Sequence, residues 1–193
     1  MSLFRSTFTV SRQTTLPASV TKEDVVTLLH DHSEMITLNP IVIKHEQMQG
    51  PSSPPPSLQQ DETTASDQDD ICSSTASAKY SITDQISYLP AHLWDSKIIY
   101  TAWFANASDG LRSFVRAPMG VEIRGSWRVI PSKPGSGPEG SGDLDHYLEE
   151  QAVVSCNSLL RPFIQSTMQK SHGTLHQRFL EKLMDGGHGG VHS

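Results

Sequence analysis

The chain has 193 residues and a formal net charge of −6, and this length suits a single domain with its own hydrophobic core. Five acids and no Lys or Arg lie in the segment 49–78, so the rest of the chain is close to neutral and lacks the basic region of a nucleic-acid-binding protein. No apolar run is long enough for a signal peptide or a membrane span, and the two cysteines, Cys72 and Cys156, do not make a disulfide framework, so we expect a cytoplasmic protein.

The first part of the chain predicts a strand, a helix and a second strand. Residues 4–16 are rich in Thr, Val and Phe, which is typical of a strand. A helix is expected over 20–29, because Thr21 is a good N-cap and Asp24 occupies the third helical position. Residues 40–48 predict the next strand, which is short.

Between this helix and this strand lies the stretch "HDHSE", residues 30–34, which contains two histidines and two acids. His30 and His32 are two positions apart, so on a helix they point to roughly opposite sides, whereas a metal-binding pair needs a spacing of three or four. We therefore interpret the stretch as a solvated helix exit rather than a metal site. A second helical turn follows it and packs inward through Met35, Ile36 and Leu38.

Three segments have too few apolar residues to contribute to a core. The acidic, Pro/Ser-rich insert 49–78 is expected to be disordered, because it buries too little surface to offset its ordering entropy. Residues 131–143 predict a Pro/Gly loop, and residues 186–193 a disordered tail. The predicted domain is a single one over 1–185, interrupted by the insert and the loop.

The rest of the chain predicts a run of strands followed by a long helix. The strands are expected at meander spacing over 79–89, 97–105, 111–117, 120–130 and 146–156. From Ser158 a helix of about 25 residues follows. Its apolar residues form one stripe at helical spacing: Leu160, Ile164, Met168, Leu175, Phe179 and Leu183.

This order of elements predicts an α+β protein with a helix-grip fold. A curved seven-stranded antiparallel sheet would wrap around the C-terminal helix, with two short helices after the first strand. The reason is that an amphipathic helix and a sheet with one apolar face each need a partner for burial. The first strand would lie beside the last, and the second beside the third.

Four stretches also carry a resemblance to a known family: "LLHDHSEMITLNPIVI", "YSITDQISYLP", "YTAWFANASDGLRSFVRAPMGVEIRGSWRV" and "CNSLLRPFIQSTMQKSH". They resemble a fungal family of uncharacterised single-domain proteins in the START-like (SRPBCC, Bet v 1-like) superfamily. The resemblance covers nearly all of the chain outside the three segments above, and "APMGVEIRGSWRV" is its most specific part. It implies the helix-grip fold and a fungal source, and it implies no activity.

Four ionisable side chains fall on otherwise apolar faces of the predicted strands: Arg12, His45, Asp84 and Glu150. A buried charge is costly unless it is paired, and the predicted strand order places Arg12 near Glu150 and His45 near Asp84. These groups would then form a polar patch in a cavity, where they anchor a ligand or transfer protons. The alternative is that they form structural salt bridges or lie at the rim.

The last helix carries His172 and His176, whose i, i+4 spacing places both on one side. Without a third ligand we interpret them as partly buried, hydrogen-bonded histidines. The motifs GxGxxG, P-loop, nucleophile elbow, CxxC and HExxH do not occur, so neither a cofactor nor a metal is expected.

Our first hypothesis for function is a monomer that holds a hydrophobic or amphipathic small molecule, of lipid or polyketide-like character, between the sheet and the last helix. The alternative to a ligand cavity is that bulky side chains among the predicted lining residues fill this space, so that the protein has an ordinary packed core. The predicted lining residues are Ile82, Tyr88, Tyr100, Phe104, Ile123, Trp127, Val154, Ile164, Met168 and Leu175.

Two further hypotheses come from other classes of protein. One is an enzyme resembling cyclases and dehydratases, in which Asp84, Glu150, His45 or Arg12 transfers protons or polarises a carbonyl. The other is an interaction module, in which the Ser/Thr-rich acidic insert 49–78 is a phosphorylatable tether for a partner.

Overall fold

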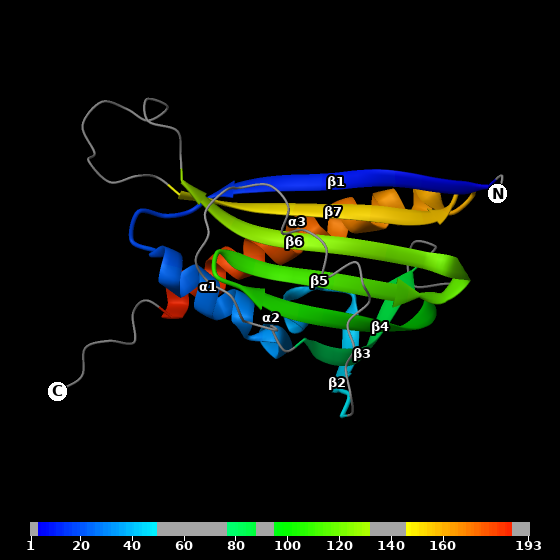
Figure 1. Cartoon of the computed structure of the whole chain (residues 1–193), viewed down its shortest axis with the longest axis horizontal. Coiled ribbons are helices and arrows are strands. Elements are labelled where there is room, and N and C mark those ends of the chain that lie inside the picture. The colour runs from blue at the N-terminus through cyan, green and yellow to red at the C-terminus, as the bar shows by residue number, and fades with distance from the viewer. Residues whose placement is uncertain (1–3, 50–76, 88–94, 132–145, 187–193) are drawn as a thin grey trace, which may run out of the picture.

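The computed structural model describes residues 4–49, 77–87, 95–131 and 146–186 (Figure 1). Within these residues seven strands form one antiparallel sheet, in the order β1-β7-β6-β5-β4-β3-β2. The elements are β1 (Arg5–Thr15), α1 (Lys22–His30), α2 (His32–Leu38), β2 (Val42–Gln47), β3 (Ala78–Ser87), β4 (Asp95–Ala107), β5 (Gly110–Ala117), the 3₁₀ turn η3 (Pro118–Gly120), β6 (Val121–Pro131), β7 (His146–Asn157) and α3 (Arg161–Gly186).

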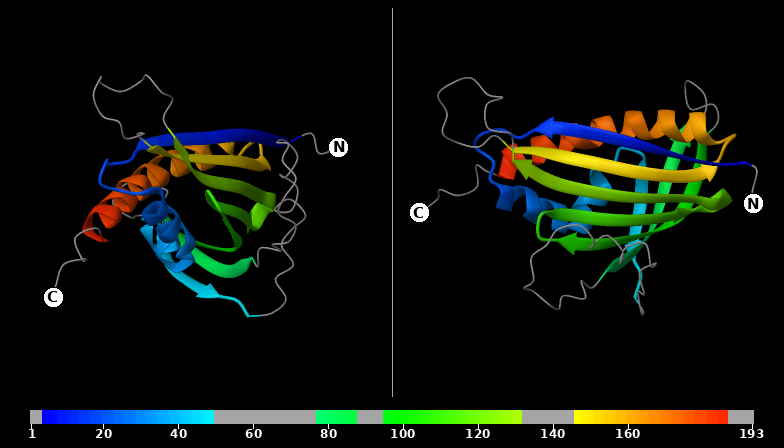
Figure 2. Two further views of the ribbon diagram at one scale, coloured as in Figure 1. Left: turned by 60° about the vertical axis from the view of Figure 1, so that its left-hand side comes forward. Right: turned by 45° about the horizontal axis from the view of Figure 1, so that its top comes forward.

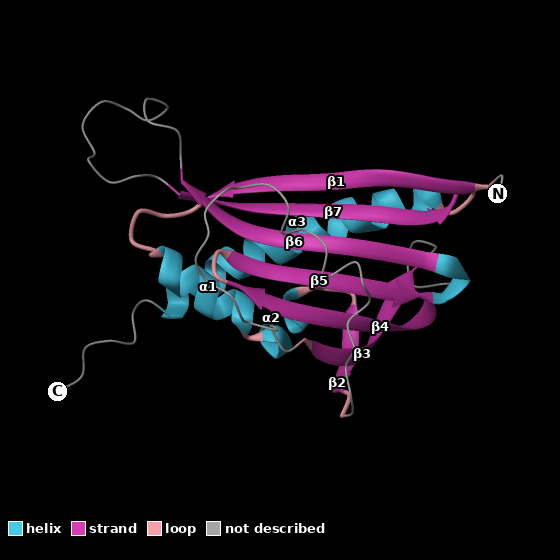
Figure 3. Ribbon diagram, in the orientation of Figure 1, coloured by secondary structure: helices cyan, strands magenta, loops and turns pink. Residues whose placement is uncertain are grey.

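The sheet is strongly curved, and α3 runs along its concave face (Figure 2). The helices α1 and α2 lie at one end of this face, where they contact β5, β2 and α3 (Figure 3). Strand β1 pairs with β7 and β2 pairs with β3, as the order of elements predicted. The predicted helix-grip fold is therefore confirmed. Among the described residues, no helix is both long and apolar enough to cross a membrane.

Polar caps define the two short helices. Thr21 and Asp24 form the predicted capping box, in which the Thr21 hydroxyl accepts from the Asp24 amide at 3.1 Å and the Asp24 carboxylate accepts from the Thr21 amide at 3.0 Å. Asp31 ends α1 and also begins α2, because its carboxylate accepts from the Glu34 amide at 2.9 Å. The chain therefore turns between the helices at a single residue.

The two histidines beside Asp31 hold the helices against the β4–β5 hairpin. The His30 Nε2–H group is 3.1 Å from the Ala107 carbonyl and 2.9 Å from that of Gly110. Nε2 of His32 lies 2.7 Å from the Asn106 side-chain oxygen. Burial lowers the pKa of His32. The predicted helix exit and the second helical turn are present, but the prediction that the exit is solvated is wrong, because both histidines are hydrogen-bonded to the hairpin.

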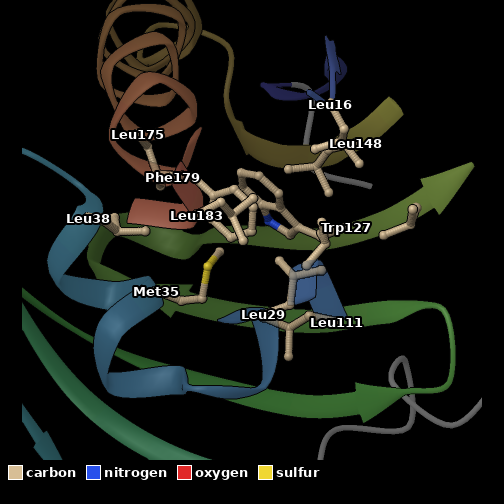
Figure 4. Packing of buried hydrophobic residues seen from close by; sticks show 12 residues of the cluster. Leu16, Leu29, Met35, Leu38, Leu111, Trp127, Leu148, Leu175, Phe179 and Leu183 are labelled. Carbon is tan, nitrogen blue, oxygen red and sulfur yellow. The ribbon is translucent and has the colours of Figure 1, made fainter. Parts of the chain in front are cut away.

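The buried apolar residues form three clusters rather than one continuous core. The first joins the ends of several strands to α1, α2 and the C-terminal half of α3 (Figure 4). The second lies between β1, β6, β7 and the N-terminal half of α3, and the third between α2, β3 and β4. The half-buried Phe104 packs against both the first and the third cluster.

Some predicted boundaries shift by one or two residues. Ser77 is buried and Ala78 is the first residue of β3, so the core of the domain resumes before the predicted end of the insert. Gly186 is the last residue of α3 and Pro131 the last of β6. The remainder of the insert, the Pro/Gly loop and the tail, together with Cys72, lie outside the described residues.

Gly110 is a position where the fold admits no side chain. A Cβ built there would lie 1.8 Å from the backbone oxygen of Trp127 on the neighbouring strand, and that backbone has no room to move. We expect Gly110→Ala to lower the free energy of unfolding by about 2 kcal/mol or more, measured by urea denaturation.

The matched control is Gly173→Ala on α3. There the new Cβ would lie 3.4 Å from the mobile guanidinium of Arg12, and alanine favours a helix over glycine by about 1 kcal/mol. Gly173→Ala should therefore leave the free energy of unfolding unchanged or raise it. Equal losses in the two variants would contradict the steric argument.

Candidate functional site

A cavity of about 480 Å³ lies between the concave face of the sheet and α3. Its walls come from α2, from every strand between β2 and β7, from η3 and from the N-terminal half of α3. The three apolar clusters each contribute to these walls, since Leu111 belongs to the first, Ala152 to the second and Ile82 to the third. All three clusters therefore border the cavity.

Small side chains keep this space open. Ser113, Gly125 and Ala152 lie directly opposite one another on β5, β6 and β7 and form a row across the cavity wall. Ala102 on β4 is also buried and lines the cavity. Larger residues at these four positions would occupy the volume, so the sequence itself encodes the cavity through small residues that face inward.

Most of the predicted lining residues face the cavity. They are Ile82, Tyr100, Phe104, Ile123, Trp127, Ile164, Met168 and Leu175. Val154 does not line the cavity, because it is fully buried in the second cluster. Tyr88 lies outside the described residues. The predicted alternative is also present in part, since Trp127 packs at a ring distance of 6.3 Å from Phe179 and fills one end of the space (Figure 4).

Glu150 is the central polar residue of this wall. Its side chain is only 3% exposed, and both carboxylate oxygens are paired with histidines of α3. One oxygen accepts from Nδ1 of His172, and the other lies 2.9 Å from Nε2 of His176. Burial by itself would raise the pKa of Glu150, but the hydrogen bonds and charges of the two histidines outweigh it and lower the pKa to about 2. Glu150 is therefore a carboxylate across the physiological pH range.

His176 is held from the other side as well. Its Nδ1 lies 2.7 Å from the hydroxyl of Thr14 on β1, and its ring stacks on Trp127 with centroids 4.7 Å apart. The chain Thr14–His176–Glu150–His172 thus runs from β1 across α3 and β7 to the cavity. His176 is buried, whereas the His172 side chain is 18% exposed and lines the cavity.

The predicted neighbour of Glu150, Arg12, takes a different role. Arg12 does lie directly opposite Glu150 in the β1–β7 ladder, as predicted. Its side chain is exposed, however, and the guanidinium reaches over Gly173 on the outer side of α3. The histidines of α3 supply the pairing that was expected from Arg12, because they approach the carboxylate from within the helix–sheet interface.

Asp84 is the second carboxyl group in the cavity. It is 7% exposed, and it accepts a hydrogen bond from the Tyr100 hydroxyl at 3.1 Å. Burial raises the pKa of Asp84 to about 6, and the Tyr100 hydrogen bond only partly opposes this rise. Burial likewise raises the pKa of Tyr100 well above its ordinary value. Because a hydroxyl and no cation of the described residues pairs with Asp84, this carboxyl group changes its charge near pH 6.

The predicted contact between His45 and Asp84 is wrong. A β-bulge between Val42 and Lys44 shifts the register of β2, so that Val42 lies opposite Asp84 and His45 lies opposite Ile82. His45 instead places its Nε2 at 2.7 Å from the Ser33 hydroxyl and does not line the cavity. Ile43, which lies at the bulge, is exposed.

His172 is the cavity residue that the strand patterns missed. Its i, i+4 spacing with His176 was visible in the sequence, but the pairing of both rings with Glu150 depends on how α3 crosses β7. The interpretation of the two histidines as hydrogen-bonded residues is confirmed. In the described residues, no group of three or more His, Cys, Asp or Glu side chains has a geometry that could hold a metal ion.

Comparisons with known proteins agree with this architecture. Residues 5–185 match the family model "Domain of unknown function (DUF7053)". The search of curated proteins found no match.

Solved structures with similar folds include two enzymes and a protein designated Ara h 8.0201. The Zhui aromatase/cyclase from Streptomyces sp. R1128 has a TM-score of 0.57 at 9% identity, over 93% of this chain and 94% of its own. A truncated norcoclaurine synthase from Thalictrum flavum has a TM-score of 0.55 at 10% identity, over 95% and 97%. Ara h 8.0201 has a TM-score of 0.50 at 10% identity, over 93% and 99%. The TM-scores show that these structures share a Bet v 1-like helix-grip fold with this chain, and at such low identities the likeness shows the fold alone.

Replacement of Glu150 by glutamine tests the pairing at the centre of the site. Because its pKa is lower in the folded protein, Glu150 stabilises the fold above pH 4.5, and this stabilisation is lost as the pH falls towards 2. We expect Glu150→Gln to lower the free energy of unfolding at pH 7 by about 1–3 kcal/mol and to reduce its decline between pH 5 and pH 3.

The control is Glu149→Gln on the outer face of the same strand. Glu149 is 2.9 Å from Gln13 and 3.9 Å from Arg128, both at the surface, so its loss should cost at most about 1 kcal/mol in urea denaturation. If the two variants lose equal stability, Glu150 does not depend on its histidines.

A second pH dependence, of opposite sign, is expected from Asp84. Because its pKa is raised from 3.8 to about 6, the folded state disfavours the charged form, and stability falls as the pH rises from 4 to 6. Asp84→Asn should remove this fall, which amounts to up to about 3 kcal/mol, in urea denaturation across that range.

Tyr100→Phe provides the matched comparison. It removes the hydrogen bond that lowers the pKa of Asp84, so the midpoint of the fall should move to higher pH. An unchanged pH profile in both variants would show that Asp84 is not the group that titrates.

Proposed function

The chain belongs to the DUF7053 family of domains of unknown function, and we propose that it binds a hydrophobic or amphipathic small molecule in the cavity between the sheet and α3. The observation that supports this proposal most directly is the row of Ser113, Gly125 and Ala152, which leaves about 480 Å³ where larger side chains would otherwise pack. Ligand sites typically measure about 300–1,000 Å³. An unfilled apolar volume lowers stability, so a ligand that fills it would be bound by the packing energy that it restores.

The lining has the composition of a ligand site. Most of it is apolar or aromatic, and its buried polar groups are concentrated in two places, at Asp84 with Tyr100 and at Glu150 with His172. A few polar groups in an apolar wall orient a ligand without contributing most of its affinity. This favours a molecule with an apolar body and few polar substituents, such as a lipid or a polyketide-like compound.

A second candidate function is that of an enzyme resembling cyclases or dehydratases. The observation that favours it is that two carboxyl groups of one cavity have pKa values shifted in opposite directions, Asp84 upward and Glu150 downward. Such a separation is typical of acid and base pairs. Of the four residues first considered, Asp84 and Glu150 line the cavity, whereas His45 and Arg12 are not among its lining residues. In an enzyme, Asp84→Asn or Glu150→Gln would abolish turnover and leave ligand binding intact.

Several features of the proposal come from sequence patterns alone. They are the fungal source, the cytoplasmic location, the monomeric state, the lack of nucleic-acid binding and the partner-binding role of the insert 49–78. Each stays a prediction.

Filling the cavity tests the binding function. We expect the apolar fluorophore N-phenyl-1-naphthylamine to bind the wild-type protein, and Ser113→Phe to weaken its binding by about tenfold or more, because the new ring lies over Gly125 inside the cavity. The measurement is a fluorescence titration.

The control is Ser126→Phe. Ser126 follows Gly125 on β6, so its side chain points to the opposite face of the sheet. Affinity should be unchanged in this variant. No binding by the wild type, or equal binding by Ser113→Phe and the wild type, would refute the proposal.

A further inference from the structure

Nδ1 of His172 is bonded to Glu150, and within the described residues no hydrogen bond joins its other ring nitrogen, Nε2, to a neighbour. Nδ1 is hydrogen-bonded to Glu150, which as a carboxylate can only accept, so Nδ1 carries a hydrogen. In the neutral ring the other nitrogen, Nε2, then has a lone pair and acts as an acceptor. Among the described residues no buried side-chain nitrogen or oxygen lacks a hydrogen-bond partner, so Nε2 is accessible rather than buried and unsatisfied.

The surroundings hold this ring in place. His172 lies on α3 one turn before His176, and both rings are hydrogen-bonded to the carboxylate of Glu150 on β7. His176 is in turn fixed by the Thr14 hydroxyl and by stacking on Trp127. A histidine whose Nδ1–H points to a carboxylate has a defined tautomer and orientation.

Other polar groups line the cavity, among them Asp84, Ser113 and Thr167, but the one imidazole among the described lining residues is that of His172, which is oriented by a hydrogen bond to a buried carboxylate. Asp84 already accepts a hydrogen bond from Tyr100. Ser171, the residue before His172, donates its hydroxyl to the backbone oxygen of Met168 at 3.4 Å. Apart from Thr167, the other residues of α3 that line the cavity, such as Ile164 and Leu175, are apolar.

We infer that Nε2 of His172 accepts a hydrogen bond from the ligand. The donor is a weakly acidic hydroxyl group of a ligand whose body is otherwise apolar. This inference rests on the proposed function, because it assigns a contact within the same cavity. Glu150 is then a positioning residue, which orients the imidazole and stabilises any positive charge that it gains. No covalent step is required, since the hydroxyl hydrogen is shared with Nε2 in a hydrogen bond.

A pair of probes that differ only at the hydroxyl tests this assignment. The probes are 2-naphthol and 2-methoxynaphthalene, titrated against the full chain by fluorescence at pH 7.5. The methyl ether retains the apolar body and cannot donate a hydrogen bond. We expect 2-naphthol to bind the wild type about tenfold more tightly, the ratio expected for one hydrogen bond to a strongly polarised acceptor.

Variants assign the preference to a residue. His172→Phe should abolish the tenfold ratio and retain affinity for 2-methoxynaphthalene. The control, His45→Phe, makes the same change at a histidine that is bonded to Ser33 outside the cavity lining, and should retain the ratio. If His172→Phe does not fold, the affinity ratio of the two probes is compared between the wild type and His172→Leu instead.

The other possible outcomes contradict the inference, and each has a different meaning for the proposed function or for the residue involved. Equal affinities of the wild type for the two probes would refute the hydroxyl contact and leave the proposed function intact. A ratio that persists in His172→Phe and disappears in Asp84→Asn would assign the hydroxyl to Asp84. If the wild type binds N-phenyl-1-naphthylamine but neither naphthalene probe, the inference fails and the proposed function stands, and if it binds none of the three, both fail.

Discussion

Glu150 is a charged group in apolar surroundings, and the arrangement of the site depends on how that charge is paired. A buried carboxylate without partners would cost several kcal/mol, so both of its oxygens need donors. The donors are His172 and His176, one turn apart on α3, and the latter is held by Thr14 of β1. These contacts require α3 to lie at one position along β7. The apolar stripe of α3 tolerates sliding more readily, so the polar contacts specify the register of the helix on the sheet.

With the helix in this register, the sizes of the inward-facing side chains of the sheet determine which part of the helix–sheet interface is packed and which part is a cavity. At one end Trp127 and Phe179 pack together and close the space. Towards the N-terminal half of α3, Ser113, Gly125 and Ala152 have too little volume to reach the helix, and a cavity results. The same concave surface thus provides a packed core at one end and a binding space at the other, and His172 lies in the wall of that space.

Much of this could be predicted from the sequence, and the exceptions have local causes. The alternation of β7 placed Glu150 inward, and the order of elements placed Arg12 opposite it, both correctly. The predicted nearness of His45 to Asp84 failed, because the bulge between Val42 and Lys44 changes the pairing of β2, so that His45 lies opposite Ile82, and a bulge leaves no clear mark in the composition. Val154 was correctly placed inward, but inward-facing residues of a strand can meet either a cavity or a neighbouring side chain.

The sequence by itself determined the helix-grip fold, since hydrophobic periodicity, caps and turn residues act over a few neighbouring positions and are legible in a linear chain. It also determined that ionisable groups would lie on inward faces. Only the tertiary structure decided which of them meet. The pairing of Asp84 with Tyr100 depends on the register of β3 against β4. The exchange of the expected Arg12 partner for His172 and His176 depends on the angle at which α3 crosses a curved sheet. That angle results from the packing of the whole core, because side chains from every element must fit at once.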